Sequence, residues 1–212
     1  MYQKKNEISE LPHIKLGGYG IDDVFPKVNM YGANSFIAKD LRQKRQLIYV
    51  DIANVPPKKD KDNSEAIKVS VLLEYYDNDD GRYLYKKYFG RWMKMPEREL
   101  GKNHTYTNIP SNGHSERLGV AYLDYGKSLI LLDSEQTDLS SDGIMINPPH
   151  LEEGMYVVVA TVTGSNLWQI PSFVFEISNA KDELLKFGVK KDGEKWIKAA
   201  NKSNKRLYGR DE

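Results

Sequence analysis

Short apolar runs recur along this chain, each rich in β-branched or aromatic residues and each followed by turn-forming residues. Such runs are typical of strands, and no segment keeps a 3.6-residue apolar period long enough to predict a long helix. Many short strands with turn signals between them predict an antiparallel all-β sandwich of about seven to nine strands. The predicted strands lie at residues 46–55, 66–77, 82–92, 116–126, 127–135, 143–149, 154–164 and 170–178.

The 212 residues are enough for one large domain with an extension at each end. Residues 1–44 begin with a stretch rich in Gly, Asn and Pro, which predicts an irregular N-terminal arm packed on the domain edge. Residues 45–180 contain the predicted sandwich. Residues 181–212 carry ten Lys and Arg against six Asp and Glu, which predicts a basic C-terminal extension. Its first part reads either as a last strand pair or as a short helix.

The composition excludes several kinds of site. The chain has no Cys, so disulfides, zinc–thiolate sites and Cys nucleophiles are ruled out. The longest apolar run, Met155 to Ala160, is far shorter than the roughly 20 residues of a membrane helix, and the N-terminus has no apolar run of the secretory type. We therefore expect a cytoplasmic protein.

Residues 74–92, EYYDNDDGRYLYKKYFGRW, place an acidic segment between two aromatic runs. A calcium loop of the EF-hand type needs acidic residues at positions 1, 3 and 5 and glycine at position 6. Counted from Asp77, position 5 is Gly81, so the segment fails this pattern. Asp-Gly favours a tight turn between paired strands. We predict that DNDDG is the turn of a hairpin and that Trp92 lies in the core.

The second strand of this hairpin is the main candidate for a binding surface. Strand alternation places Tyr83, Tyr85 and Lys87 on one face, and Arg91 follows. We predict that these four residues contact a protein partner or a second copy of the chain. The alternative is single-stranded nucleic acid bound through residues 82–94 and the basic tail, since aromatic and basic side chains can stack on bases and meet phosphates. The net charge of only +1 and the mixed faces of the strand weigh against that alternative.

Motifs for catalysis and cofactor binding fail on inspection. The sequence GHSERLG at 113–119 lacks the second glycine of a nucleophile elbow and leads into a predicted strand, so we interpret Asn112-Gly113 as a turn. The segment GGYG at 17–20 lacks the strand and the Lys-Ser/Thr of a phosphate loop. The four histidines show no metal-ligand spacing: His13, His104, His114 and His150. We predict no catalytic residue, no cofactor and no metal, and we expect that the protein is not an enzyme.

Residues 152–158, EEGMYVV, resemble the signature that opens strand F in immunoglobulin-like sandwiches, an acidic residue followed by x-G-x-Y-x-C. Gly154 and Tyr156 match, and Val158 stands where the family has Cys. The resemblance implies that the Tyr156 hydroxyl bonds back to the preceding corner. Over residues 45–178 the chain also looks like uncharacterised archaeal and bacterial cell-adhesion-type (CARDB-like) modules. This likeness rests on the order of LIYVDIANV, AIKVSVLLEYYD, GRW, the Pro-containing loop before GVAYL, and EGMYVVVATVTG.

The resemblance implies an immunoglobulin-like antiparallel β-sandwich and a non-enzymatic role as a protein-interaction or accessory module, a subunit of a larger assembly. One alternative is a structural component of a viral or other particle, and the other is the single-strand binding described above. The predicted core consists of Ile48, Val50, Ile52, Val69, Val71, Leu73, Trp92, Leu118, Val120, Leu129, Leu131, Tyr156, Val158, Ala160, Phe173 and Phe175. We also expect Ile67 on the same face of its strand as Val69 and Val71.

Overall fold

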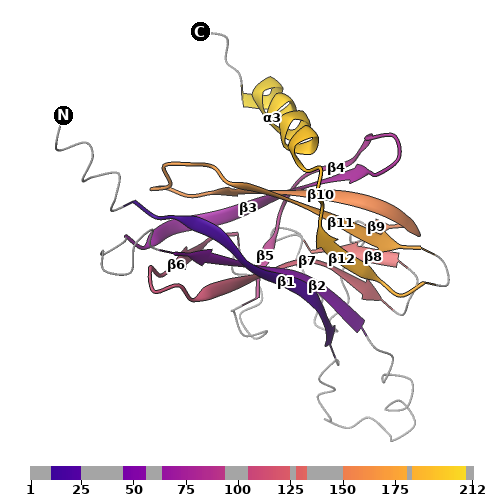
Figure 1. Cartoon of the computed structure of the whole chain (residues 1–212), viewed down its shortest axis with the longest axis horizontal. Helices are drawn as coiled ribbons and strands as arrows, with labels where there is room; N and C mark the ends of the chain where they lie inside the picture. The colour runs from indigo at the N-terminus through magenta and orange to yellow at the C-terminus, as the bar shows by residue number, and fades with distance from the viewer. Residues whose placement is uncertain are drawn as a thin grey trace, which may run out of the picture.

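The computed structural model of this chain is a sandwich of two antiparallel β-sheets (Figure 1). It describes residues 11–24, 45–55, 64–93, 105–124, 128–132, 150–180 and 183–208. The predicted all-β sandwich is therefore confirmed. The strand predicted at 143–149 falls outside the described residues.

Each sheet has five strands in a continuous order and a sixth strand paired beside them. The first sheet has the order β1-β2-β7-β8-β9, with β5 also paired to β7. Its strands are β1 (Ile14–Val24), β2 (Arg45–Asn54), β5 (Arg91–Trp92), β7 (Ser115–Asp124), β8 (Ser128–Leu131) and β9 (His150–Leu151). The second sheet has the order β12-β11-β10-β3-β4, with β6 also paired to β3. Its strands are β3 (Ala66–Asp77), β4 (Tyr83–Phe89), β6 (Thr107–Ile109), β10 (Gly154–Thr163), β11 (Ser172–Asn179) and β12 (Lys186–Val189).

The core between the sheets contains the residues that the sequence predicted. All sixteen lie in it or against it, and Phe173 alone among them is only partly buried. Trp92 is 3 % exposed, and its indole Nε1 donates to the carbonyl oxygens of Val69 at 3.2 Å and Thr105 at 3.3 Å. Its burial is confirmed, and its polar atom is satisfied, as a buried indole requires.

One side chain ties the two sheets together through a hydrogen bond. Tyr75 on β3 is fully buried, and its hydroxyl donates to the carbonyl of Val120 on β7 at 3.0 Å. The same carbonyl accepts the backbone N–H of Leu132 at 3.1 Å. It can accept both because a carbonyl oxygen has two lone pairs.

The chain crosses from one sheet to the other at Gly90. β4 pairs with β3 in the second sheet, whereas β5 pairs with β7 in the first. The Gly90 N–H still donates to the Val71 carbonyl at 2.9 Å. A Cβ at Gly90 would stand 2.7 Å from Leu118 Cδ2, so only glycine fits this crossing without a shift of the core.

The expectation for Ile67 was wrong. Lys68 has a φ of 50°, and the pairing of β3 with β6 shifts register between Ala66 and Val69. This bulge breaks the alternation, so that Ala66 is buried and Ile67 is 41 % exposed. Asn108 Oδ1 accepts the Lys68 N–H at 3.0 Å and stabilises the bulge from another strand.

Residues 14–24 form β1, where the sequence predicted an irregular arm. β1 pairs with β2 along its length, with a register shift between Leu16 and Gly18. The shift places Leu16, Tyr19 and Ile21 opposite residues of β2 that face the core, at spacings of three and then two. Because this spacing fits neither the alternation of a strand nor the period of a helix, the sequence pattern did not predict a strand here.

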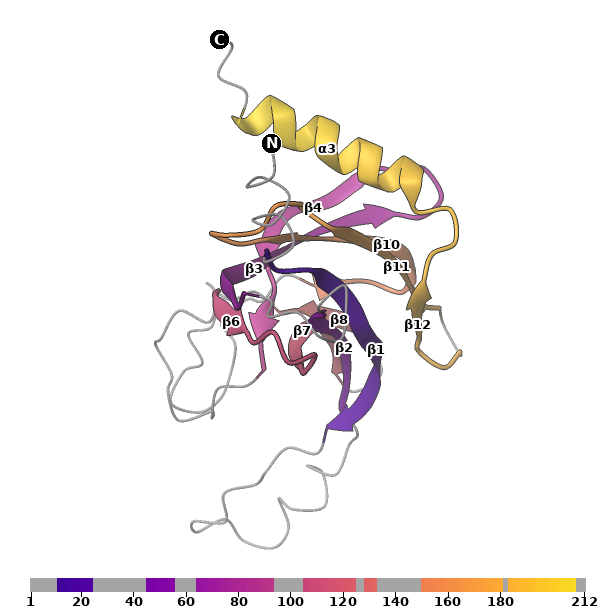
Figure 2. The ribbon, with the colours of Figure 1, turned by 60° about the vertical axis from the view of Figure 1, so that its left-hand side comes forward.

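The C-terminal segment combines the two structures that the sequence left open. β12 pairs with β11, so it belongs to the second sheet, and α3 (Glu194–Tyr208) is a helix rather than a strand. α3 lies over the outer face of the second sheet (Figure 2). Trp196 and Ala200 are 5 % and 1 % exposed, and they form a second apolar cluster with Tyr76, Val157, Val159 and Val174.

Within the residues that the structure describes, α3 included, no helix has the length and apolar character needed to span a bilayer.

Candidate functional site

The predicted partner-binding residues divide between the two sheets. Tyr83 and Tyr85 lie on β4, at the end of the second sheet, where their backbones pair with β3. Lys87 lies on the same strand, whereas Arg91 lies on β5, is half-buried, and is opposite Gly119 of the first sheet. The side chains of Tyr83, Tyr85 and Lys87 fall outside those that the structure describes. A shared binding surface for these residues stays a prediction.

The DNDDG segment is the hairpin turn that the sequence predicted. Asp77 Oδ1 accepts the Asp79 N–H at 2.8 Å, and the Asp77 carbonyl accepts the Gly81 N–H at 3.1 Å. Gly81 has a φ of 69°, which glycine adopts at little cost. The Asp80 carboxylate also accepts the Arg82 N–H at 2.8 Å. The Asp77 and Asp80 carboxylates therefore stabilise the turn by accepting hydrogen bonds from its backbone.

The segment that resembled a nucleophile elbow is also a turn. Asn112 Oδ1 accepts the His114 N–H at 3.0 Å, and Ser115 begins β7. His104 lies outside the described residues, and in the described part no three His, Asp or Glu side chains are placed to hold a metal ion.

The hydroxyl of Tyr156 makes the contact that the resemblance implied. It donates to the carbonyl of Glu152 at 2.7 Å, and the side chain is 7 % exposed. Gly154 lies under the ring, where a Cβ would be 2.9 Å from the Tyr156 hydroxyl. The sequence E-x-G-x-Y thus builds a hydrogen-bonded corner at the start of β10.

A charged cluster lies on the outer face of the first sheet. The Arg117 guanidinium bonds Asp51 at 2.9 Å and Asp22 at 2.5 Å, and it lies 3.6 Å above the ring centroid of Tyr49. The hydrogen bond that Arg117 donates to Asp51 raises the pKa of Arg117, against the opposing effect of partial burial. The cluster joins β1, β2 and β7, so we interpret it as a structural tie across the sheet.

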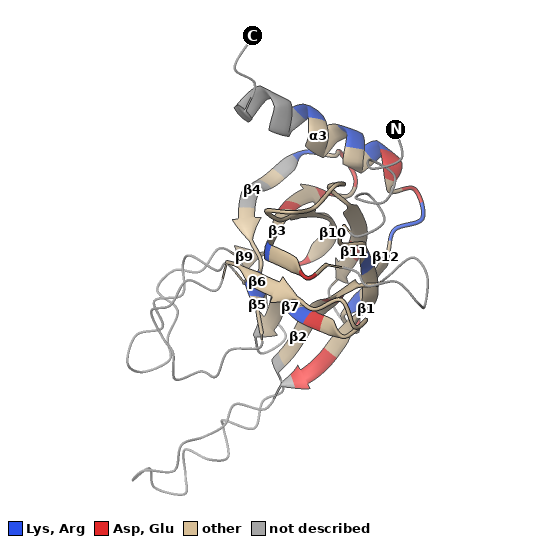
Figure 3. Ribbon diagram, turned by 90° about the vertical axis from the view of Figure 1, so that its left-hand side faces the viewer, with Lys and Arg blue, Asp and Glu red and all other residues tan. Residues whose placement is uncertain are grey.

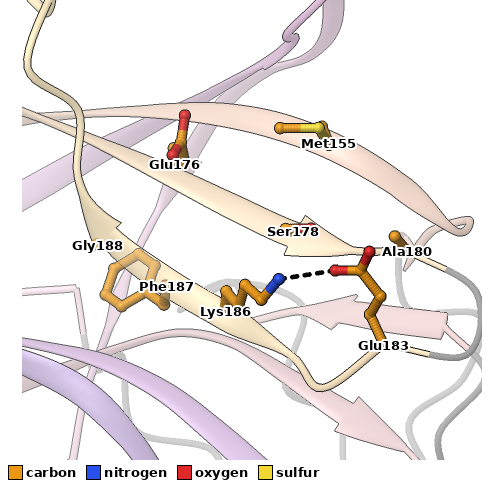
Figure 4. Close-up of a pocket in the computed structure, with 8 residues that line it drawn as sticks. All are labelled: Met155, Glu176, Ser178, Ala180, Glu183, Lys186, Phe187 and Gly188. Atoms are coloured by element: carbon orange, nitrogen blue, oxygen red, sulfur yellow. Dashed lines mark hydrogen bonds and ion pairs between the residues drawn. The ribbon is translucent and has the colours of Figure 1, made fainter.

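A shallow pocket of about 400 Å³ lies on the outer face of β10, β11 and β12 (Figure 4). Glu183 and Lys186 form an ion pair at 2.7 Å on its rim, and this pair lowers the pKa of Glu183. Glu176 pairs with Lys190 at 2.7 Å. The charged residues that line the pocket, Glu176, Glu183 and Lys186, each form an ion pair. A catalytic acid or base does not resemble such a paired group.

The loop from β10 to β11 carries exposed apolar side chains that the sequence did not lead us to expect. Trp168 and Ile170 are 64 % and 65 % exposed, and Ile67 at the start of β3 is 41 % exposed. We call these three residues the apolar tip. The available signal was a Trp and an Ile in a short, Pro-ended connection between two strong strands, SNLWQIP. Trp is highly buried on average, so a Trp that is 64 % exposed departs from the usual pattern.

The apolar tip stands on a loop that is fixed by hydrogen bonds. Asn166 Oδ1 accepts the Ile67 N–H at 2.9 Å, and Asn166 Nδ2 donates to the Glu65 carbonyl at 2.8 Å. The Ser165 N–H donates to the Ile67 carbonyl at 2.9 Å. Leu167 packs against the core, between these polar contacts and Trp168. After Ile170 the Pro171 carbonyl accepts the Val162 N–H at 2.9 Å, so the loop is anchored on both sides of the exposed side chains.

No protein-family model matches the sequence, and a search of curated proteins gives no significant match. The likeness to CARDB-like modules therefore rests on the pattern of residues alone.

Proposed function

We propose that this chain is a non-enzymatic protein-interaction module on an immunoglobulin-like scaffold, and that it joins a larger assembly through the apolar tip. The observation that carries the proposal is the exposure of Trp168 and Ile170 on an anchored loop. Exposed aromatic anchors on rigid supports are typical of protein-binding surfaces, because little conformational freedom is lost when they bind.

The strand order supports the immunoglobulin-like part of the proposal. β2 and β7 face β3, β10 and β11 across the core, and β10 carries the Tyr156 corner. Val158 and Val50 lie in the common core, where the family often has a disulfide between sheets. Trp92 departs from that pattern. The family has its buried Trp on strand C, which corresponds to β3, whereas Trp92 lies on β5.

The partner expected at the apolar tip is a protein surface with an apolar pocket. An indole buries about 150–250 Å² when it is enclosed, which is enough for a binding hot spot. We expect Trp168→Ser to weaken partner binding about thirtyfold or more, which corresponds to a loss of about 2 kcal/mol.

Site-specific photo-crosslinking tests the proposal. A benzoylphenylalanine replaces Trp168 in the full chain, and the labelled protein is irradiated in nuclease-treated extract of the source cells. We expect one discrete protein adduct, which unlabelled wild-type chain competes away and the double variant Trp168→Ser/Ile170→Ser does not. The matched control carries the crosslinker at Leu184, which is 84 % exposed in the connection before β12.

Three results would contradict the proposal: equal adducts at both positions, equal competition by the wild type and the double variant, or no adduct in the absence of nucleic acid. An adduct between two copies of this chain would instead indicate that the partner at the apolar tip is a second copy of the chain.

A further inference from the structure

We propose that the exposed face of α3 binds the phosphate backbone of nucleic acid. The helix has two distinct faces. Trp196 and Ala200 are buried against the second sheet, whereas Lys195, Lys198 and Lys202 are exposed. Spacings of three and four residues place these lysines on one stripe of the helix. We call them the lysine stripe (Figure 3).

The dimensions of the lysine stripe suit a run of phosphates. Lys195 and Lys202 are seven residues apart, or about 10 Å along the helix axis at about 1.5 Å per residue. A nucleic-acid strand carries one phosphate per nucleotide, so each of the three lysines can neutralise one phosphate. In the sequence, Lys205 and Arg206 continue the same spacing.

The packing of α3 favours this partner over a membrane. A helix that binds a bilayer surface inserts its apolar face into the lipid. Here Trp196 and Ala200 are covered by the sheet, and the Trp196 ring also lies against the turn at Gly81. Over Lys195–Lys202 the exposed side chains of α3 are those of Lys195, Lys198, Ala199, Asn201 and Lys202.

A protein partner fits the stripe poorly, because lysine is depleted in protein interfaces and the stripe holds no exposed aromatic or aliphatic anchor among its described side chains. Phosphate recognition depends instead on charge, which lysine supplies at any rotamer within reach.

The acidic groups near α3 define which part of the stripe is free. Asp192 and Glu194 are exposed at the start of the helix, and Asp79 and Asp80 are exposed on the β3–β4 turn that carries Gly81. The lysines extend away from this end, so all three can meet phosphates, and the contacts at Lys198 and Lys202 are expected to be the strongest.

Fluorescence anisotropy with a 5′-labelled oligo-dT of 20 nucleotides tests the inference. Full-length wild-type chain is compared with the triple variant Lys195→Gln/Lys198→Gln/Lys202→Gln between about 0.05 and 0.5 M salt. Each phosphate neutralised on a single strand contributes about 0.7 to the slope of log K against log salt, so we expect the slope to fall by about 2. This change in slope corresponds to binding of the triple variant that is about a hundredfold weaker at 0.1 M salt.

The matched control neutralises three lysines elsewhere on the described surface: Lys15→Gln, Lys68→Gln and Lys186→Gln. We expect this variant to bind within about twofold of wild type. Circular dichroism of all three proteins checks that α3 is retained. Equal losses in the two triple variants, no wild-type binding at the lowest salt, or binding to anionic phosphatidylserine vesicles without binding to oligo-dT would overturn the inference. The lysine stripe shares no residue with the apolar tip. The oligo-dT titration therefore does not test the proposed protein-binding role, and the photo-crosslinking does not test binding to nucleic acid.

Discussion

Replacing Tyr156 with phenylalanine removes one oxygen from the corner at the start of β10 and leaves the ring in place. That oxygen donates to the Glu152 carbonyl at 2.7 Å. Glu152 itself is exposed, so the corner lies at the surface of the sandwich. We expect the free energy of unfolding to fall by the net contribution of one hydrogen bond, about 1 kcal/mol. For a chain of this size we expect the melting temperature to fall by about 2–4 °C.

Equilibrium urea unfolding, followed by the fluorescence of the three tryptophans, measures this loss. The midpoint should fall while the slope stays unchanged. Tyr19→Phe is the matched control, because its side chain is 43 % exposed and its ring contacts with Phe175 and Phe187 are kept. We expect the control to lie within about 0.5 kcal/mol of wild type. If Tyr156→Phe is no less stable than Tyr19→Phe, the corner hydrogen bond does not stabilise β10 and the reasoning fails.

Three further predictions concern the scaffold. Tyr75→Phe should lower the free energy of unfolding by about 1–2 kcal/mol in the same urea assay, because it removes one of the buried hydrogen bonds between the sheets; an unchanged midpoint would refute this role. Gly90→Ala should cost about 1–3 kcal/mol through overpacking, whereas Gly188→Ala, whose Cβ meets nothing within 4 Å, should be close to neutral; equal costs would contradict the steric argument. A double-mutant cycle with Asp51→Ala and Arg117→Ala should give a coupling below about 1 kcal/mol that weakens in salt, since the pair is partly exposed; a salt-independent coupling would argue against a solvent-screened pair.

The predictions that held depend on short stretches of sequence. The DNDDG turn follows from Asp-Gly and side chains that bond to their own backbone two residues on. The Tyr156 corner lies within five consecutive residues, Glu152 to Tyr156. The buried faces of β2 and β10 follow from alternating or continuous apolar residues.

The predictions that failed depend on contacts between distant residues. Ile67 is exposed because the bulge at Lys68 is stabilised by Asn108, 40 residues away. The Ile67 N–H also donates to the Asn166 side chain, 99 residues away, so the loop that carries Trp168 and Ile170 is hydrogen-bonded to the residue next to the bulge. No local pattern encodes either contact, and the exposure of Trp168 could not be distinguished in the sequence from burial.

The sandwich class, most of the core and two turns could be predicted from the sequence, because these follow from residue periodicity and local hydrogen bonding. The crossing between sheets at Gly90 and the place of β1 in the first sheet could be seen only in the folded chain. The same is true of the basic tail, which Trp196 docks as a helix on the second sheet. The physical reason is that each of these depends on which surfaces meet across the fold, and a run of residues carries no record of its distant neighbours.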